Sequence, residues 1–203
     1  MFLHKIRYGD SMKIIISVCG NGVCEEGSVN AQLAFEVGKK LVDNGYRVMT
    51  GGLDGVMKYA LQGAKASKKY REGDTVAVLP MYDERVANEY ADIVIPTGID
   101  LARDVITANT PAVIAIGGGS GTLGEIANAW TLYRMVIAME TATGWSAKVA
   151  NTQVGEKRIY DENFEDMVWG AKDADDVIKL LDEKLKHYNL RFDRITFDGK
   201  RIR

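Results

Sequence analysis

The chain has 203 residues, of which 46% are hydrophobic and 27% charged, and its formal net charge is −2. This balance is typical of a soluble globular protein large enough to bury a core, and it gives no support for nucleic-acid binding through a basic face. No apolar run is long enough to span a bilayer, and the opening MFLHKIRYGD lacks the apolar region of a secretory signal. We therefore expect a cytoplasmic protein with neither a nucleic acid nor a membrane as partner.

The first 95 residues predict an alternation of strands and helices. In chain order the predicted elements are a strand over 12–18, a helix from Ser28 or Asn30 to about Asn44, a strand over 46–50, a helix from Val56 to about Lys68, a strand over 75–79, a polar loop or short helix over 83–91, and a strand over 92–95. The first helix is capped by a side-chain oxygen and stopped by Asn44-Gly45.

The same alternation continues to the C-terminal end. The predicted elements are a loop and helix over 97–110, a strand over 112–116, a helix over 122–134, a strand over 135–139, a loop with a short helical piece over 140–160, a strand over 166–169, and an amphipathic helix from Ala174 to about His187. The final RFDRITFDGKRIR alternates like a strand, so a hairpin, a swapped arm and a disordered end all stay open.

Alternating strands and helices predict an α/β fold, a doubly wound and mostly parallel Rossmann-like sheet with helices on both faces. We expect one nucleotide-binding domain over 12–188, with terminal extensions at 1–11 and 189–203. Ligands of such sheets bind outside the carboxyl ends of the strands. Three Gly-rich turns, at 20–27, 51–55 and 117–121, follow predicted strands, so we expect all three to meet in one crevice.

The strongest ligand-binding signal is the stretch PAVIAIGGGSGTLGEIANAWTLYR, residues 111–134. A buried strand, a Gly-rich turn and a helix N-terminus together form an anion site, most often for phosphate. The first turn lacks GxGxxG spacing and no acidic residue follows the second strand, so a mononucleotide or sugar phosphate fits better than NAD. The residues expected to bind the ligand are Gly20, Gly51, Gly52, Gly118, Gly119, Ser120, Gly121 and Thr122.

Two charged residues near this loop each have two interpretations. Glu125 is either a catalytic carboxylate or the partner of Thr122 in a capping box, because the spacing is T-x-x-E. Arg103 either holds an anion with two parallel hydrogen bonds or forms an ion pair with Asp100 or Asp104.

Cys19 and Cys24 flank a Gly-Asn-Gly turn without the C-x-x-C spacing and without a second pair of Cys or His. We therefore expect two thiols and no zinc site, and a redox role for them stays open. No spacing in the chain requires a metal ion, although Mg²⁺ could bind through a ligand's phosphate.

These residues carry a resemblance to a known family. The GG turn at Gly51-Gly52, Arg103 ahead of the fifth strand and above all GGGSGTLGE at 117–125 resemble the LONELY GUY superfamily, whose motif reads PGGxGTxxE. The variant with Gly117 in place of the motif proline is similar to the branch that includes molybdenum cofactor carrier proteins and Rossmann-like nucleotide-binding proteins. The resemblance covers nearly all of residues 12–187.

The resemblance implies a homodimer or larger homo-oligomer with a nucleotide site at the carboxyl edge of the sheet. In enzymatic members the motif's Gly and Thr residues bind a 5′-phosphate, and the motif Glu and an upstream Arg act on the N-glycosidic bond of a nucleoside 5′-monophosphate. These catalytic roles fall here on Glu125 and Arg103. The chain departs from those enzymes at Asp104, where they carry Lys or Asn, and a carboxylate there weakens the local positive field.

Three hypotheses follow for the function. The chain binds a nucleoside 5′-monophosphate or similar phosphorylated ligand and hydrolyses it to base and ribose 5-phosphate, or it is a non-catalytic carrier of the molybdenum cofactor, or it is a nucleotide sensor. None requires a further cofactor. Lysine decarboxylation, a label also given to this superfamily, is not supported, because pyridoxal phosphate chemistry needs a Schiff-base lysine and none lies in the three turns.

Overall fold

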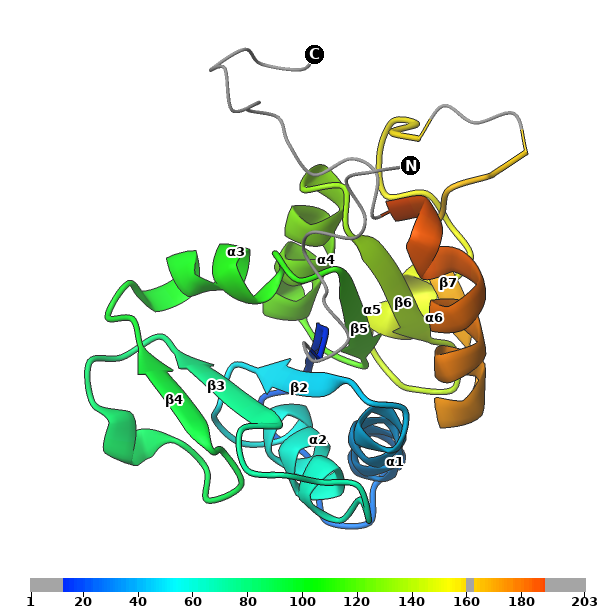
Figure 1. The fold of residues 1–203 in the computed structure, drawn as a ribbon. Helices are drawn as coiled ribbons and strands as arrows, with labels where there is room; N and C mark the ends of the chain where they lie inside the picture. Colours follow the sequence, from blue (N-terminus) through cyan, green and yellow to red (C-terminus); the bar gives the residue numbers. More distant parts are fainter. Residues whose placement is uncertain (1–12, 160–162, 189–203) are drawn as a thin grey trace, which may run out of the picture.

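The computed structural model of the protein describes residues 13–159 and 163–188 (Figure 1). The expected extensions at 1–11 and 189–203 lie outside the described residues, and so does the tail whose three alternatives stay open. The assignment of 12–188 to one domain stays a prediction.

Seven parallel strands form one sheet, which confirms the predicted doubly wound fold (Figure 1). Their spatial order is β4-β3-β2-β1-β5-β6-β7. The strands are β1 (Ile15–Gly20), β2 (Arg47–Thr50), β3 (Thr75–Leu79), β4 (Ile93–Pro96), β5 (Ala112–Ile116), β6 (Met135–Met139) and β7 (Trp169–Ala171). The order reverses between β1 and β5, which is the switch point where such sheets bind ligands.

Helices cover both faces of the sheet (Figure 1). One layer holds α1 (Val29–Asp43), α2 (Val56–Lys65) and α6 (Ala174–Tyr188), and the other holds α3 (Asp104–Thr107), α4 (Ser120–Thr131) and α5 (Trp145–Val149). Two short 3₁₀ turns, η1 (Glu84–Val86) and η2 (Asp100–Arg103), flank β4. No helix among residues 13–159 and 163–188 has the length and hydropathy needed to cross a membrane.

The first two helices pack unusually closely because glycine lies at their contact. A Cβ on Gly38 would lie 1.9 Å from the carbonyl oxygen of Ala60, and one on Gly63 would lie 1.9 Å from that of Phe35. The α1 helix begins where predicted, since the Ser28 side chain accepts a hydrogen bond from the Ala31 amide. These contacts lie in the middle and the C-terminal half of α2 and hold the two helices together.

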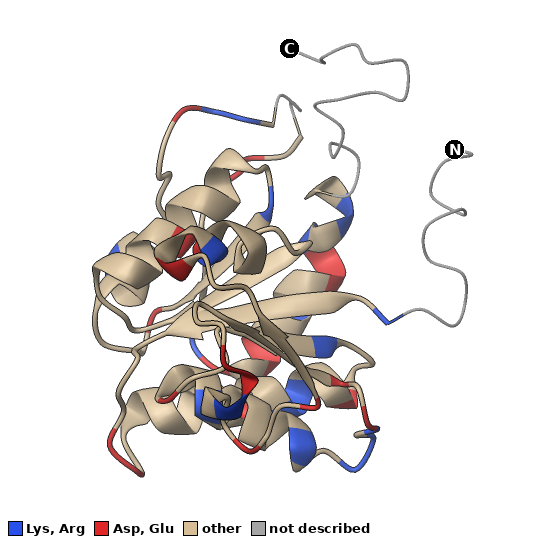
Figure 2. Ribbon diagram, turned by 90° about the vertical axis from the view of Figure 1, so that its left-hand side faces the viewer, with Lys and Arg blue, Asp and Glu red and all other residues tan. Residues whose placement is uncertain are grey.

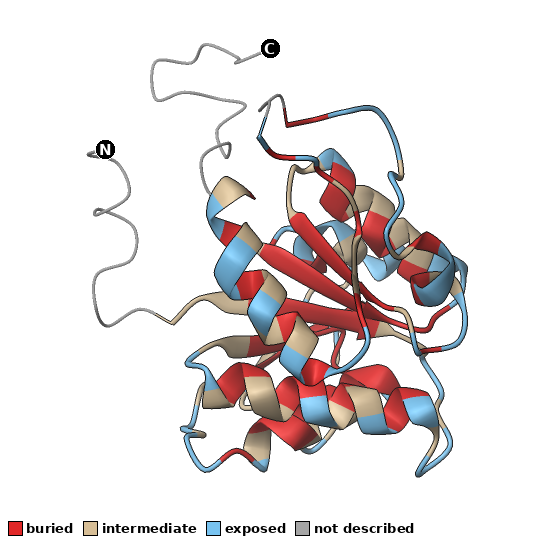
Figure 3. Cartoon of the chain, turned by 90° about the vertical axis from the view of Figure 1, so that its right-hand side faces the viewer, coloured by how far each residue is buried: buried red, intermediate tan, exposed pale blue. Residues whose placement is uncertain are grey.

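Strands β3, β5 and β6 are buried along their whole length, as Figure 3 shows for the middle of the sheet. The apolar runs TVAVL, AVIAI and MVIAM therefore mark these three strands at the predicted residues, because a strand covered on both faces needs no polar alternation.

The prediction of a last strand over 166–169 is wrong. The strand is β7, which pairs Trp169 with Ile137 of β6 and ends at Ala171. Asp166 instead turns its buried carboxylate to Arg158, with Nε and Oδ2 2.5 Å apart. Asp166 is therefore held by an ion pair with Arg158, which lies in the same segment between β6 and β7, and it does not pair in the sheet as the sequence pattern suggested.

Arg158 also closes the end of α4. Its Nη1 donates to the carbonyl oxygen of Trp130 at 2.6 Å, and its guanidinium lies 3.9 Å from the centre of the Trp130 ring. Carbonyl groups in the last turn of a helix have no partner within the helix, so a buried cation there satisfies them. The helix that carries Glu125 is thus anchored at its C-terminal end.

Candidate functional site

The three Gly-rich turns meet at the carboxyl edge of the sheet through one residue, Asn21. Its Oδ1 accepts hydrogen bonds from the Gly118 amide at 2.7 Å and from Asn30 Nδ2 at 2.8 Å. Its own carbonyl oxygen accepts from the Val56 amide at 2.9 Å. Asn21 therefore joins the first turn to the second and the third, and the convergence expected from the strand order is present.

The third turn needs glycine because of its backbone. Gly117 and Gly118 have φ angles of 67° and 90°, a region that L side chains rarely adopt. The Gly117 amide donates to Ser146 Oγ at 2.7 Å, and the carbonyl oxygens of Gly117 and Gly118 accept from the amides of Ser146 and Trp145. The hydrogen bonds of this half of the turn are satisfied by the protein itself, so within the described residues only the amides after it are left without a partner.

The N-terminus of α4 is open. The helix begins at Ser120 after Gly119, and no side chain of the described residues caps it. Gly119, Ser120 and Gly121 are exposed, and a Cβ on either glycine would meet no atom within 4 Å. Amides in the first turn of a helix lack intrahelical acceptors, and the dipole there favours an anion. The helix therefore begins at the switch point with an exposed start that no side chain of the described residues caps.

The capping-box interpretation of Glu125 is wrong. Thr122 lies inside α4 rather than before it, and it is buried with its hydroxyl against Gly118, where a Cβ would lie 2.1 Å from Oγ1. Glu125 does not reach back to the helix start. It accepts a hydrogen bond from Thr107 Oγ1 at 3.0 Å and one from the Cys19 thiol.

Glu125 is a buried carboxyl group, with 9% of its surface exposed. The pKa of Glu125 is raised to about 7. Burial is the largest cause and the neighbouring Asp104 adds to it, while Arg103 and the hydrogen bonds from Thr107 and Cys19 act in the opposite direction. Burial also raises the pKa of the Cys19 thiol well above its usual range. Glu125 is therefore a group that can take up or release a proton near neutral pH.

Arg103, in η2, lies close enough to Glu125 to influence its pKa, and 12% of the Arg103 side chain is exposed. Its Nε is 3.2 Å from Asp104 Oδ1, and neither Nε nor Nη1 has a hydrogen-bond partner in the part of the chain that the structure describes. The ion-pair interpretation thus holds for Asp104 by distance, without hydrogen-bond geometry. Burial raises the pKa of Asp104, and Arg103 partly offsets that effect. Arg103 therefore keeps two buried donors without a hydrogen-bond partner among the described residues.

The expected glycines of the first two turns have structural reasons to lack a side chain. A Cβ on Gly51 would lie 2.1 Å from Arg103 Nη1, so glycine there lets the guanidinium lie against the backbone. A Cβ on Gly20 would lie 2.1 Å from the Ile116 carbonyl oxygen, and one on Gly52, at φ 77°, would lie 2.6 Å from Ala77 Cβ. Gly51 therefore belongs to the Arg103 site, whereas Gly20 and Gly52 serve close packing.

Sequence reasoning missed the polar side chains that hold the turns together. They are Asn21, Asn30, Thr107, Thr143 and Ser146. Asn21 could have been recognised from its position between Gly20 and Gly22, because a short polar side chain in a Gly-rich turn often hydrogen-bonds to the backbone. No local signal marks Thr107 or Ser146, because their partners lie 18 and 29 residues away.

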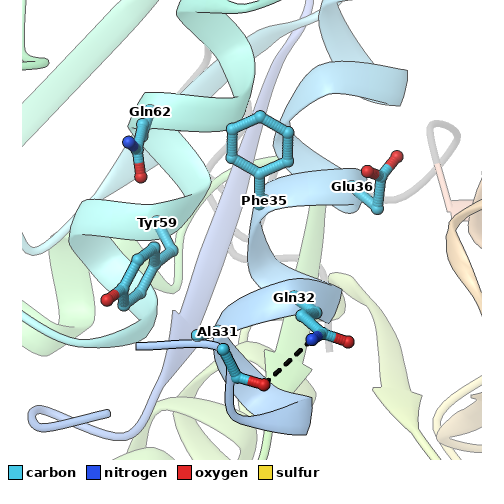
Figure 4. A pocket seen from close by; sticks show the side chains of 7 residues that line it. Ala31, Gln32, Phe35, Glu36, Tyr59 and Gln62 are labelled. Atoms are coloured by element: carbon cyan, nitrogen blue, oxygen red, sulfur yellow. Dashed lines mark hydrogen bonds between the residues drawn. The ribbon is translucent and has the colours of Figure 1, made fainter. Parts of the chain in front are cut away.

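A surface groove of about 360 Å³ lies elsewhere, between α1 and α2 (Figure 4). Phe35 and Tyr59 line it from the two helices, and Gln32 closes one end by donating to the Gly27 carbonyl oxygen at 2.9 Å. It contains none of the predicted site residues. The described residues also contain no group of three or more His, Cys, Asp or Glu side chains that could hold a metal ion.

Comparisons with solved structures agree with this architecture. The structure of TM1055 superposes with a TM-score of 0.70 at 25% identity, covering 85% of this chain and 99% of the other. The molybdenum cofactor binding protein from Rippkaea orientalis gives a TM-score of 0.67 at 28% identity, covering 85% and 97%. The molybdenum cofactor carrier protein from Chlamydomonas reinhardtii gives 0.67 at 29% identity, covering 86% and 99%.

Sequence comparison gives a relative and a family. An uncharacterized protein of Archaeoglobus fulgidus is 39% identical over 118 residues, which are 57% of this chain and 74% of the relative. The model of the SLOG cluster4 family matches residues 13–168, which include β1 to β6, all three Gly-rich turns, Arg103 and Glu125. Since this match spans well over half of its length, the chain belongs to the SLOG cluster4 family.

Proposed function

We propose that this protein binds a small molecule bearing a phosphate monoester at the N-terminus of α4. The observation that carries the proposal is the open first turn of that helix, where the amides of Ser120, Gly121 and Thr122 follow the exposed Gly119 with no side-chain cap among the described residues. A phosphate placed there accepts several amide hydrogen bonds and faces the positive end of the helix dipole. Arg103 supplies a positive charge at the same edge of the sheet, which Asp104 partly offsets at 3.2 Å.

Two kinds of phosphate-bearing ligand are the candidates, a nucleoside 5′-monophosphate and the molybdenum cofactor. Likeness to a molybdenum cofactor carrier protein, over nearly the whole of that protein, supports the second. In such a carrier the α4 turn would hold the terminal phosphate of the cargo, and no proton transfer is needed. Binding without a chemical reaction therefore requires only the helix start already described at residues 119–122.

Hydrolysis of a nucleoside 5′-monophosphate is a second candidate, and Glu125 favours it. In this reaction the bond between C1′ and the base nitrogen breaks, water adds to C1′, and the base leaves with a proton. A carboxyl group with a pKa near 7 can take the proton from the attacking water and stabilise positive charge developing on the ribose. Arg103 would hold the phosphate or the leaving base, as the LONELY GUY resemblance implies.

The experiment that separates these candidates measures base release and binding together. Purified protein is incubated with AMP, GMP, CMP and UMP, free base is followed by chromatography, and the melting temperature is recorded with each nucleotide. Base release that falls by about a hundredfold or more in Glu125→Gln supports hydrolysis. A raised melting temperature without base release supports a carrier or sensor, and the molybdenum cofactor is then tested in the same binding assay. If none of these ligands raises the melting temperature, the proposed phosphate site is contradicted.

We infer a cytoplasmic location from the composition and from the two cysteines, neither of which forms a disulfide in the part of the chain that the structure describes.

A further inference from the structure

Glu125 lies in a cluster that contains more acidic side chains than basic ones. The cluster consists of Cys19, Arg103, Asp104, Thr107 and Glu125, which come from β1, η2, α3 and α4. Arg103 Nε lies 3.2 Å from Asp104 Oδ1, and Thr107 Oγ1 lies 3.0 Å from Glu125 Oε1. The side chains of Arg103 and Asp104 are only 12% and 15% exposed. One guanidinium thus faces two carboxyl groups where little water screens their charges.

Among the described residues, Arg103 is the basic side chain that acts on Glu125. The described elements that pack on α4 are α3, α5, β1, β5 and β6. The three strands contain no Asp, Glu, Lys or Arg, and Figure 2 shows the middle of the sheet in tan. The ionisable side chains of β1, α3, α5 and the preceding η2 are Cys19, Asp104, Lys148, Asp100 and Arg103. Asp100 is exposed and adds negative charge, and Lys148 lies 4.8 Å from the centre of the Trp145 ring of its own helix.

The hydrogen bonds around Thr107 allow Glu125 to be either ionised or protonated. The Thr107 hydroxyl has one hydrogen and lies near two acceptors, Glu125 Oε1 at 3.0 Å and the Asp104 carbonyl oxygen at 3.1 Å. When Glu125 is ionised, the hydroxyl donates to it, and the Asp104 carbonyl oxygen keeps its bond from the Ala108 amide at 2.9 Å. When Glu125 is protonated, its carboxyl group donates to Thr107, which then donates to the Asp104 carbonyl oxygen. Glu125 can therefore change its protonation state without a change of fold.

A phosphate at the start of α4 would add a third anion to this cluster. Gly121 and Glu125 are four residues apart on the same helix, which is a rise of about 6 Å along its axis. A phosphate monoester carries about two negative charges above pH 7. Arg103, with two donors that have no hydrogen-bond partner among the described residues, is then shared by three acidic groups. The added negative charge disfavours the ionised form of Glu125 and leaves the protonated form unaffected.

We propose that a phosphate-bearing ligand and a proton bind this site together, and that Glu125 takes up the proton. This inference rests on the proposed phosphate site and adds the control of its affinity by pH. Because coupling between two ligands is reciprocal, the proton strengthens phosphate binding as much as the phosphate strengthens proton binding. The pKa of Glu125 is about 7 without the ligand, so the coupling operates from neutral pH upward. The ligand is held at neutral pH and released as the pH rises.

The test is calorimetric titration with AMP and with ribose 5-phosphate between pH 7 and pH 9. Both probes are phosphate monoesters with a second pKa of about 6, so they stay dianionic over this range. We expect the Kd of the wild type to rise about tenfold or more from the lower pH to the higher. Titrations at pH 8 in buffers of different ionisation enthalpy count the protons, and we expect uptake of about 0.5–1 proton for each probe bound.

Three variants assign this proton to its group. Glu125→Gln removes the titrating group, so its Kd should change by less than about twofold over the same range and no proton should be taken up. Glu36→Gln is the matched control, because Glu36 is an exposed carboxylate on α1 outside the cluster, and it should behave as the wild type. Asp104→Asn removes a carboxylate that raises the pKa of Glu125, so its affinity should begin to fall at a lower pH than that of the wild type.

Circular dichroism establishes that each variant is folded, and Asp104→Asn keeps the inference testable if Glu125→Gln does not fold. Binding to the wild type with a Kd independent of pH and without proton uptake overturns this inference and leaves the phosphate site standing. Proton uptake that persists in Glu125→Gln also overturns the inference, because another group would then take up the proton. If neither probe binds at any pH, the phosphate site is overturned and the inference with it.

Discussion

Placing a carboxylate in the first turn of α4 should have opposite effects on stability and on ligand binding. Gly121 is exposed, its added Cβ would meet nothing within 4 Å, and its φ is not positive, so Gly121→Asp fits without strain. Replacing a helical glycine stabilises a helix by about 0.5–1 kcal/mol, and an acidic side chain at the N-terminus adds about 0.3–1 kcal/mol. Asp has a lower helix propensity than Ala, so we expect the unliganded variant to be more stable by about 1 kcal/mol.

The same carboxylate competes with a phosphate for the helix N-terminus. Two unit charges 4 Å apart near a protein surface repel by about 4 kcal/mol, and screening by salt reduces this. Even half of that energy weakens binding by about 30-fold. Gly121→Asn is the matched control, because it has the same shape without the charge, and we expect its affinity to lie close to that of the wild type.

The assay is calorimetric titration of the wild type and both variants with the phosphorylated ligand that gives the largest thermal shift, together with their unfolding in urea. The reasoning is refuted if Gly121→Asp binds as tightly as Gly121→Asn, because the phosphate would then not lie at this helix end. A fall in stability of the unliganded Gly121→Asp would refute the account of α4 as a helix with an open, uncapped start.

Three further predictions concern residues around this helix. Because the pKa of Glu125 is higher in the folded chain than its ordinary value near 4.5, the wild type should lose up to about 3 kcal/mol of stability relative to Glu125→Gln as the pH rises from about 4.5 to 7, which urea unfolding at each pH measures. Gly51→Ala should displace the Arg103 guanidinium and weaken ligand binding by about tenfold, whereas Gly22→Ala, whose Cβ meets nothing, should not, as titration of the two variants will check. Arg158→Met should lower the free energy of unfolding by about 3–5 kcal/mol, because it leaves a buried carboxylate without its partner, and a denaturant titration followed by tryptophan fluorescence measures this.

The sheet was predictable because its strands obey a local rule. Strands β3, β5 and β6 are short apolar runs with clear boundaries, and their burial on both faces leaves no competing pattern. The last strand, β7, was predicted about three residues too early because it is short and its residues Trp169–Ala171 carry no such run. Its position depends on pairing with β6 and on the ion pair that draws Asp166 away.

The candidate site was predictable in its backbone and only partly in its side chains. The glycines of the third turn indicate a left-handed backbone, which Gly117 and Gly118 adopt. The environment of Glu125 was not predictable, because it depends on Thr107 from another helix and on Cys19 at the end of β1. Spacing suggested a capping box for Glu125, and tertiary contacts determined its actual partners.

The central claim is that a phosphate binds the first turn of α4, and the most direct test is a titration of the ¹⁵N-labelled protein followed by amide chemical shifts. Adding the nucleoside monophosphate or molybdenum cofactor that raises the melting temperature should shift the amides of Gly119, Ser120, Gly121 and Thr122 most strongly, and the corresponding nucleoside without phosphate should not. Shifts confined instead to the groove between α1 and α2, at Phe35 and Tyr59, would contradict the claim.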